Sequence, residues 1–227
     1  TSAIARRSDA YEHIDPGLVG NGTRFLVSEM SGRSTIALKA EQLGIELDGE
    51  VLGEIVETLK ELEYAGYHFE AADASLELLM RAASGWSHDY FVLESFSVNV
   101  GHRSGSGSRA WNDVAVEVET EATVKLHLDG ERVVATGGGN GPVNALDAAL
   151  RKALDDSFPQ LERLHLTDFK VRVLETRQGT GAVTRVLIDT TNGEQTWTTI
   201  GVSENIIEAS WQALVDSLVF GVLHTDA

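Results

Sequence analysis

A glycine-rich segment, Thr136-Gly-Gly-Gly-Asn-Gly-Pro-Val143, is the part of the chain best suited to binding chemistry. It joins a predicted strand to a predicted helix, and Pro142 stands near the first helical position, where proline is favoured. Glycines let a ligand approach bare backbone amides, and a helix N-terminus favours a carboxylate or a phosphate. A tight strand-to-helix turn explains the same residues equally well. The segment therefore predicts either an anion site or a purely structural turn.

Two other patterns are weaker. Gly105-Ser-Gly-Ser-Arg-Ala110 has the spacing of a dinucleotide fingerprint, but Trp111-Asn-Asp113 and another predicted strand follow where a helix should begin. A flexible hairpin tip is the better interpretation. His127-Leu-Asp129 would point two side chains to one face of a strand, as in a metal pair, but no third ligand accompanies them. We interpret this pair as the exposed end of a strand.

The remaining reactive residues form no catalytic constellation. The chain has no cysteine, which excludes thiolate nucleophiles, thiolate metal sites and disulfides. Most acids lie three or four residues from bases on predicted helix faces, the usual solvated arrangement. The other histidines, which make no His-x-His or HExxH pattern, are His13, His68, His88, His102, His165 and His224. The residues alone therefore specify no reaction.

Composition bounds the class of protein. The 227 residues carry a net charge of -17, and 42% of them are hydrophobic, which is enough to bury a core in one or two domains. Such a charge disfavours nucleic acid and anionic membranes, because phosphate binding needs clustered Lys and Arg. The sequence has no uninterrupted apolar run of the ~18 residues that a membrane span needs, and no signal peptide opens it. We therefore expect a soluble, cytoplasmic protein.

An internal repeat organises the second part of the chain. Residues 144–155 align with residues 205–216, with an Asn, an acid, an Ala and a final Asp in common and nearly every apolar position matched. Asp129-Gly130 and Asn192-Gly193 each predict a tight hairpin turn upstream of the repeated helix. A unit of strand, hairpin and helix has been used twice. Two copies suit a pseudo-twofold domain with equivalent helix N-termini and a groove between its halves.

Hydrophobic periodicity predicts the elements that position these segments. Helices are expected from an N-cap at Asp48 to a stop at Gly66, from about Glu70 to Ala83, and over residues 203–223. The last helix should be capped by Ser203 and should have Ile206, Ile207, Trp211 and Leu214 on its core side. Strands are predicted at 91–100, 114–128, 132–135, 168–174, 183–189 and 196–200.

The order of these elements predicts an α+β fold, with a β-sheet covered by helices. A small helical part precedes the strands. Residues 1–47 are rich in turn formers, and only Arg24–Val27 looks like a short strand there.

Several long blocks resemble a known family. The blocks at residues 140–154, 167–174 and 201–217 are similar to the C-terminal regulatory domain of citramalate synthases, in the 2-isopropylmalate and homocitrate synthase superfamily. The blocks at residues 11–16, 27–34 and 61–75 resemble the segment after that family's catalytic barrel. They occur in the family's order and cover almost the whole chain.

The resemblance implies part of a transferase that condenses acetyl-CoA with pyruvate or a related 2-oxo acid, in isoleucine or leucine biosynthesis. Its metal-dependent TIM barrel would precede Thr1, so this chain is expected to carry no cofactor and to be inactive alone. Residues 1–85 would be linker subdomains, and residues 86–227 an allosteric regulatory domain that pairs into a homodimer. A complete 2-isopropylmalate-type synthase and a free-standing amino-acid-binding module remain as alternatives.

Site residues also follow from the resemblance. Tyr11 would lie near the mouth of the barrel's active site, unless it is a packing tyrosine in a loop. The family's effector, here isoleucine or leucine, binds between two protomers near the helix N-termini and the loop after the fourth strand. Glu175-Thr-Arg-Gln178 lacks the aromatic residues that some relatives have there, so the effector's identity stays open. The implied effector-binding residues are Gly139, Asn140, Gly141, Pro142, Leu174, Thr176, Thr180 and Ala182.

Overall fold

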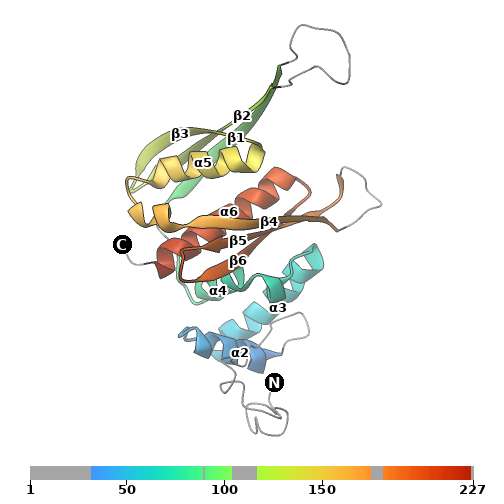
Figure 1. Cartoon of the computed structure of the whole chain (residues 1–227). Coiled ribbons are helices and arrows are strands. Elements are labelled where there is room, and N and C mark those ends of the chain that lie inside the picture. Colours follow the sequence, from blue (N-terminus) through green and yellow to red (C-terminus); the bar gives the residue numbers. More distant parts are fainter. Residues whose placement is uncertain (1–31, 89, 104–116, 175–180, 226–227) are drawn as a thin grey trace. The chain divides into compact units, whose positions relative to one another are not determined.

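The computed structural model describes residues 32–88, 90–103, 117–174 and 181–225 (Figure 1). The chain divides into two compact units, Thr1–Ser87 and His88–Ala227. The described part of the first unit is helical, and all described strands belong to the second. The predicted strand at Arg24–Val27 and the glycine-serine stretch at 105–110 lie outside the described residues.

The first unit is built around a helix whose two ends were predicted. The Asp48 carboxylate accepts hydrogen bonds from the backbone N–H groups of Glu50 and Val51, at 2.9 and 2.8 Å, which caps the first turn of the helix. Gly66 ends the helix with a φ of 115°, which suits a residue without a side chain. The elements of this unit are α2 (Arg33–Gln42), α3 (Gly49–Ala65), the short η3 (Phe69–Ala71) and α4 (Asp73–Ala83).

Helix α2 corrects the expectation that residues 1–47 hold only turns and a strand. Ile36 and Ala40 are buried, while Ala37 and Leu38 between them are half-buried, so the apolar residues do not mark one helical face. Without that periodicity this helix could not be predicted from its residues. Helix α4 also begins later than predicted, at Asp73, because the single turn of η3 precedes it.

The second unit contains two copies of one arrangement, which confirms the predicted α+β fold and its repeated strand-hairpin-helix unit. Each copy is a three-stranded antiparallel sheet followed by a long helix. The first copy comprises β1 (Val92–Arg103), β2 (Glu117–Leu128), β3 (Glu131–Gly139) and α5 (Pro142–Leu154). The second, which follows the short η4 (Pro159–Arg163), comprises β4 (His165–Val173), β5 (Thr184–Thr191), β6 (Thr196–Ser203) and α6 (Ile206–His224).

The two hairpin turns differ, although the sequence predicted the same tight turn for both. Asp129 and Gly130 form a two-residue turn with φ of 49° and 83°, as predicted. The second hairpin has four residues between its strands. There the Asn192 side chain accepts hydrogen bonds from the N–H groups of Glu194 and Gln195, at 3.0 and 2.8 Å. The side-chain oxygen of Asn192 thus accepts hydrogen bonds from backbone N–H groups in this turn, in place of a backbone carbonyl.

Each long helix covers the inner face of its own sheet. Helix α5 packs on β2 and β3, and α6 packs on β5 and β6. Under α6, the buried Thr190 and Ser217 hydroxyls lie 2.6 Å apart, and the Thr199 hydroxyl donates to the Ala213 carbonyl at 2.8 Å. Helix α6 has the length and composition of a membrane span, and half of that stretch is buried inside the protein, as in a core helix.

The start of α6 differs from the prediction in two ways. The cap is Asn205, whose side chain accepts from the N–H of Ile207 at 2.9 Å, while the Ser203 hydroxyl accepts from the N–H of Asn205. Ile206 is exposed rather than on the core side, because it occupies the first helical position. Trp211 and Leu214 are buried as predicted.

Glycines set the distance between each helix and its sheet. Strand β3 extends through Gly137, Gly138 and Gly139, which were predicted to form a loop after Ala135. A Cβ on Gly137 would collide with the α5 backbone at Ala149, and one on Gly139 would lie 2.5 Å from the Ala145 nitrogen. These glycines therefore let α5 approach the strand closely.

This close approach predicts different effects for two neighbouring substitutions. Gly137→Ala should lower the free energy of unfolding by about 1 to 3 kcal/mol, because the new methyl group overpacks against the backbone of α5. Gly138→Ala is the matched control, since its Cβ would meet only the Thr120 carbonyl, at an ordinary 3.8 Å. Urea unfolding followed by circular dichroism measures both. Equal midpoints for the two variants would contradict the packing explanation.

Candidate functional site

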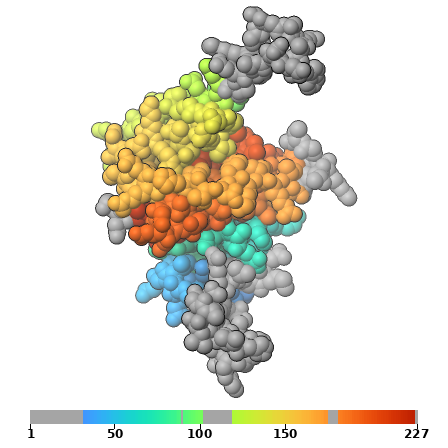
Figure 2. Space-filling model, in the orientation of Figure 1, coloured from blue at the N-terminus to red at the C-terminus, as the bar shows by residue number. Residues whose placement is uncertain are grey.

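A cavity of about 880 Å³ lies along α5 in the second unit. Its wall combines the first turn of α5, the following turns on one face of that helix, η4 and the start of β4, and Figures 1 and 2 show α5 and β4 next to each other on one face. The lining residues are Asn140, Gly141, Pro142, Val143, Asn144, Asp147, Arg151, Asp155, Leu161, Glu162, Leu164, His165, Leu166 and Phe169.

The N-terminus of α5 opens into this cavity without a side-chain cap from the described residues. Gly141 precedes the helix in extended conformation, and Pro142 has no N–H to donate. The side chain of Asn144 accepts from the N–H of Asn140, at 3.1 Å, instead of capping the helix. The first turn of α5 therefore presents backbone N–H groups and the positive end of the helix dipole to a ligand.

Of the implied effector residues, the structure places Asn140, Gly141 and Pro142 in the wall of one cavity. Gly139 stands just before them, and its contact with α5 gives it a packing role.

The second half of the implied set lies elsewhere in the chain. Leu174 follows the far end of β4, where its N–H donates to the Val183 carbonyl at 2.9 Å, and Ala182 is buried before β5. Neither residue lines the cavity. Thr176 and Thr180 lie outside the described residues, as does Tyr11.

An ion pair in the cavity wall was not recognised from the sequence. Arg151 Nε lies 2.9 and 3.0 Å from the two carboxylate oxygens of Asp147, and Arg151 Nη1 donates to the Leu161 carbonyl at 2.9 Å. The i,i+4 spacing predicted a solvated pair on a helix face. That prediction is wrong in one respect, because η4 brings Leu161 against Arg151 and the pair is mostly buried.

Burial governs the protonation of this pair. Removal from water raises the pKa of Asp147 above its ordinary value, and the charge and hydrogen bond of Arg151 offset only part of that effect. Ionisation of the buried carboxylate is therefore unfavourable because the charge is removed from water. A ligand ammonium group beside it would stabilise the ionised form.

The cavity marks the place where the two halves of the domain differ. Phe96 on β1 stacks on Trp211 of α6, with ring centroids 4.8 Å apart. The repeat aligns Phe96 with Phe169 and Trp211 with Leu150. Phe169 lines the cavity and remains exposed. A bulky indole thus fills the contact between β1 and α6, whereas the equivalent place between β4 and α5 is open.

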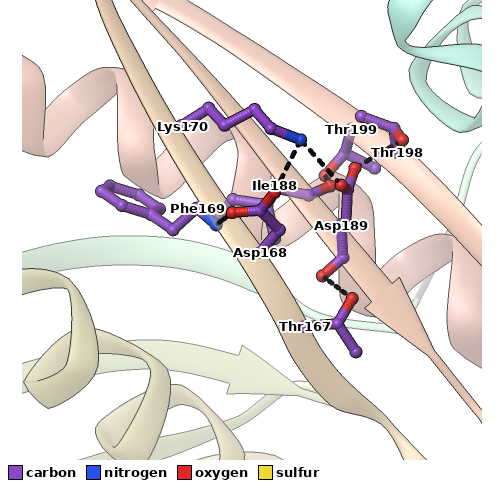
Figure 3. A network of polar contacts seen from close by, with 8 residues as sticks. All are labelled: Thr167, Asp168, Phe169, Lys170, Ile188, Asp189, Thr198 and Thr199. Atoms are coloured by element: carbon purple, nitrogen blue, oxygen red, sulfur yellow. Dashed lines mark hydrogen bonds and ion pairs between the residues drawn. The ribbon is translucent and has the colours of Figure 1, made fainter.

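Figure 3 shows a polar network on the face of β4 that points away from the cavity and from Phe169. Lys170 Nζ lies 2.7 Å from Asp168 Oδ2 and 3.1 Å from Asp189 Oδ2, and the Thr198 hydroxyl donates to Asp189 at 2.6 Å. The hydrogen bond with Lys170 lowers the pKa of Asp168 and raises that of Lys170. Because side chains alternate along a strand, this network faces away from Phe169 and fixes the outer surface of the sheet rather than the cavity.

The possible metal pair also belongs to an outer face. His127 Nε2 lies 3.6 Å from Glu94 Oε2, and Glu94 also forms an ion pair with Arg132. Asp129 lies in the hairpin turn. Within the described residues, no group of three or more His, Cys, Asp or Glu side chains could hold a metal ion.

Comparison with known families agrees with this architecture. The family model described as the LeuA allosteric (dimerisation) domain matches residues 70–220, and the model described as homocitrate synthase post-HMGL domain-like matches residues 1–66. The chain therefore belongs to the LeuA allosteric (dimerisation) domain family, because that match covers more than half of it.

Individual relatives are more specific. The chain is 53% identical over 98% of its length to the (R)-citramalate synthase of Streptomyces coelicolor, and 46% identical over 97% to that of Synechocystis. The (R)-citramalate synthase of Aquifex aeolicus is 44% identical over 98% of the chain. The chain spans about 40% of the length of these relatives. The resemblance to citramalate synthases is confirmed.

The raised pKa of Asp147 predicts a pH-dependent difference between the protein and its Asp147→Asn variant. A carboxyl whose pKa is higher when folded adds stability at low pH, and this stability is lost as pH rises through the folded pKa. The unfolding free energy of the protein minus that of Asp147→Asn should therefore increase from pH 7 to pH 4. Urea unfolding at several pH values tests this, and the difference cancels other titrating groups. A difference that shrinks on acidification would show that the Arg151 pair dominates.

Proposed function

We propose that this chain is the feedback-regulatory and homodimerising portion of a citramalate synthase-type enzyme. That enzyme condenses acetyl-CoA with pyruvate or a related 2-oxo acid in isoleucine or leucine biosynthesis. The observation that carries the proposal is the cavity beside α5, which combines an uncapped helix N-terminus with an apolar wall. Membership of a family described as allosteric and dimerising, and the similarity to (R)-citramalate synthases, support it.

The chemistry of the cavity favours a branched-chain amino acid. The backbone N–H groups at the start of α5 suit the ligand's carboxylate, and the Asp147 carboxylate suits its ammonium group. Leu161, Leu166 and Phe169 offer apolar surface to the side chain. Burying a butyl-sized group contributes roughly 2 to 3 kcal/mol, and a charge-assisted hydrogen bond about 1.5 to 3. Part of this gain orders the site, so we expect micromolar affinity.

A dimer would explain why Leu174 and Ala182, which the family resemblance assigns to the effector site, do not line the cavity within one chain. The cavity volume of about 880 Å³ is near the upper end of the range for ligand pockets, which is generous for one amino acid. In the family the effector lies between two protomers. On this proposal Leu174 and Ala182 of a second protomer complete the site that Asn140, Gly141 and Pro142 begin.

The proposed site predicts that Gly141→Val weakens effector binding without unfolding the domain. A Cβ on Gly141 would meet no described atom within 4 Å, and its backbone is extended, so valine fits the fold. The two added methyl groups would then occupy space beside the first turn of α5. We expect at least a tenfold weaker affinity for whichever of isoleucine, leucine and valine binds, measured by calorimetric titration.

Gly49→Val is the matched control, because a Cβ there also meets no described atom within 4 Å and the residue starts α3 in the other unit. This variant should bind like the unmodified protein. Unchanged affinity in a folded Gly141→Val protein would place the site elsewhere. Absence of heat and of thermal shift with all three amino acids would remove the effector function.

A further inference from the structure

An apolar strip remains exposed on the inner face of β4. Phe169, Val171 and Val173 are 40%, 41% and 50% exposed. Their partners in the adjacent strand include Ile188 and Val186, which are fully buried beneath α6. The strip therefore continues the core face of the sheet, but among the described residues α6 packs mainly on β5 and β6, and this edge strand stays exposed.

The other half of the domain shows how such a strand can be covered. The repeat aligns Phe96 and Val98 of β1 with Phe169 and Val171 of β4. Phe96 and Val98 are half-buried, and the Phe96 ring stacks on Trp211. Phe169 instead lines the cavity. The exposed strip is thus the place where one half lacks the cover that its counterpart has.

Strand β4 also has a free backbone edge within the described residues, since it pairs with β5 alone. An exposed strand edge with an apolar face is a ready template for another chain. Both features lie on the same strand, and the strip reaches the cavity through Phe169. One partner could therefore cover the strip and close the cavity.

The charges along β4 suit a second copy of the same chain. A net charge of -17 makes two copies repel each other unless they meet at a locally balanced surface. Strand β4 offers such a surface: Asp168, Lys170 and Arg172 alternate with the apolar residues. In an antiparallel pairing about a twofold axis at Lys170, Asp168 would face the second copy's Arg172, and Phe169 its Val171.

The repulsion of the two central lysines in that pairing is reduced within each chain. Lys170 lies within 3.1 Å of the carboxylates of both Asp168 and Asp189. We propose that a second copy of this chain pairs with β4 and covers its Phe169-Val171-Val173 strip, thereby closing the cavity beside α5. This proposal rests on the proposed homodimer and names the surface that forms it.

Aspartate substitutions test the surface. Val171→Asp and Val173→Asp place a charge in the strip, and an unpaired buried charge should raise the dimer dissociation constant by about 100-fold or more. Val134→Asp is the matched control, because Val134 is also 50% exposed but lies on the outer face of β3. Sedimentation at tens of micromolar should find dimers for the unmodified chain and Val134→Asp, and monomers for the two strip variants. Circular dichroism confirms that all are folded.

A cysteine variant keeps the test decisive if an aspartate variant unfolds. The chain has no native cysteine, so Val171→Cys carries a single thiol. Its reaction with a maleimide should be about tenfold slower in the dimer than in a dilute, monomeric sample, because the partner covers the thiol. Val134→Cys should react equally fast in both. Equal rates for Val171→Cys would overturn the surface.

The outcomes separate this proposal from the proposed function. A monomeric unmodified chain would remove the homodimer and the surface together. A dimer that persists in folded Val171→Asp and Val173→Asp would overturn only the surface. Dissociation by Val134→Asp alone would move the interface to the outer face of the first sheet.

Discussion

The structure of the second unit depends on the close contact between a helix and side-chain-free stretches of strand. Gly137 and Gly139 bring the backbone of α5 against β3, and Gly201 admits the backbone of α6 at Ala209 in the same way. This contact fixes where α5 begins, and it explains why its first turn lies immediately after the strand. The sequence allowed these glycines to serve either a ligand or a structural turn, and in the structure Gly137 and Gly139 leave room for the helix. Gly141, two residues further along, precedes the first turn of α5 and lines the cavity.

The internal repeat is the second organising feature, and its imperfection is more informative than its symmetry. The two halves share topology and helix placement. They differ where the helix of one copy meets the edge strand of the other: Trp211 fills the place between α6 and β1, and a cavity occupies the place between α5 and β4. The helix N-termini differ too, since Asn205 caps α6 and the described residues provide no such cap for α5. The duplicated scaffold thus has two equivalent contacts between its copies, one closed and the other open.

Local chemistry made part of this predictable. The caps at Asp48 and Gly66 and the turn at Asp129 each follow from one or two residues, so the sequence was sufficient. Helix α2 was missed because its apolar residues mark no single face. The burial of the Asp147–Arg151 pair was missed because it depends on Leu161, ten residues beyond the arginine. The cavity was missed because its lining comes from α5, η4 and β4 together, and only the packed structure brings these segments side by side.

The Phe96–Trp211 stack has a consequence for the energetics of local opening. Regions with few buried apolar contacts open at lower free energy than the packed core, in cooperative units smaller than the whole domain. Trp211 in the Phe96 stack is buried, whereas Phe169 at the equivalent place is exposed and has fewer neighbours to lose on opening. Any molecule that binds and orders this edge would therefore bind less tightly than its contacts alone would allow, because ordering restricts the motion of the strand.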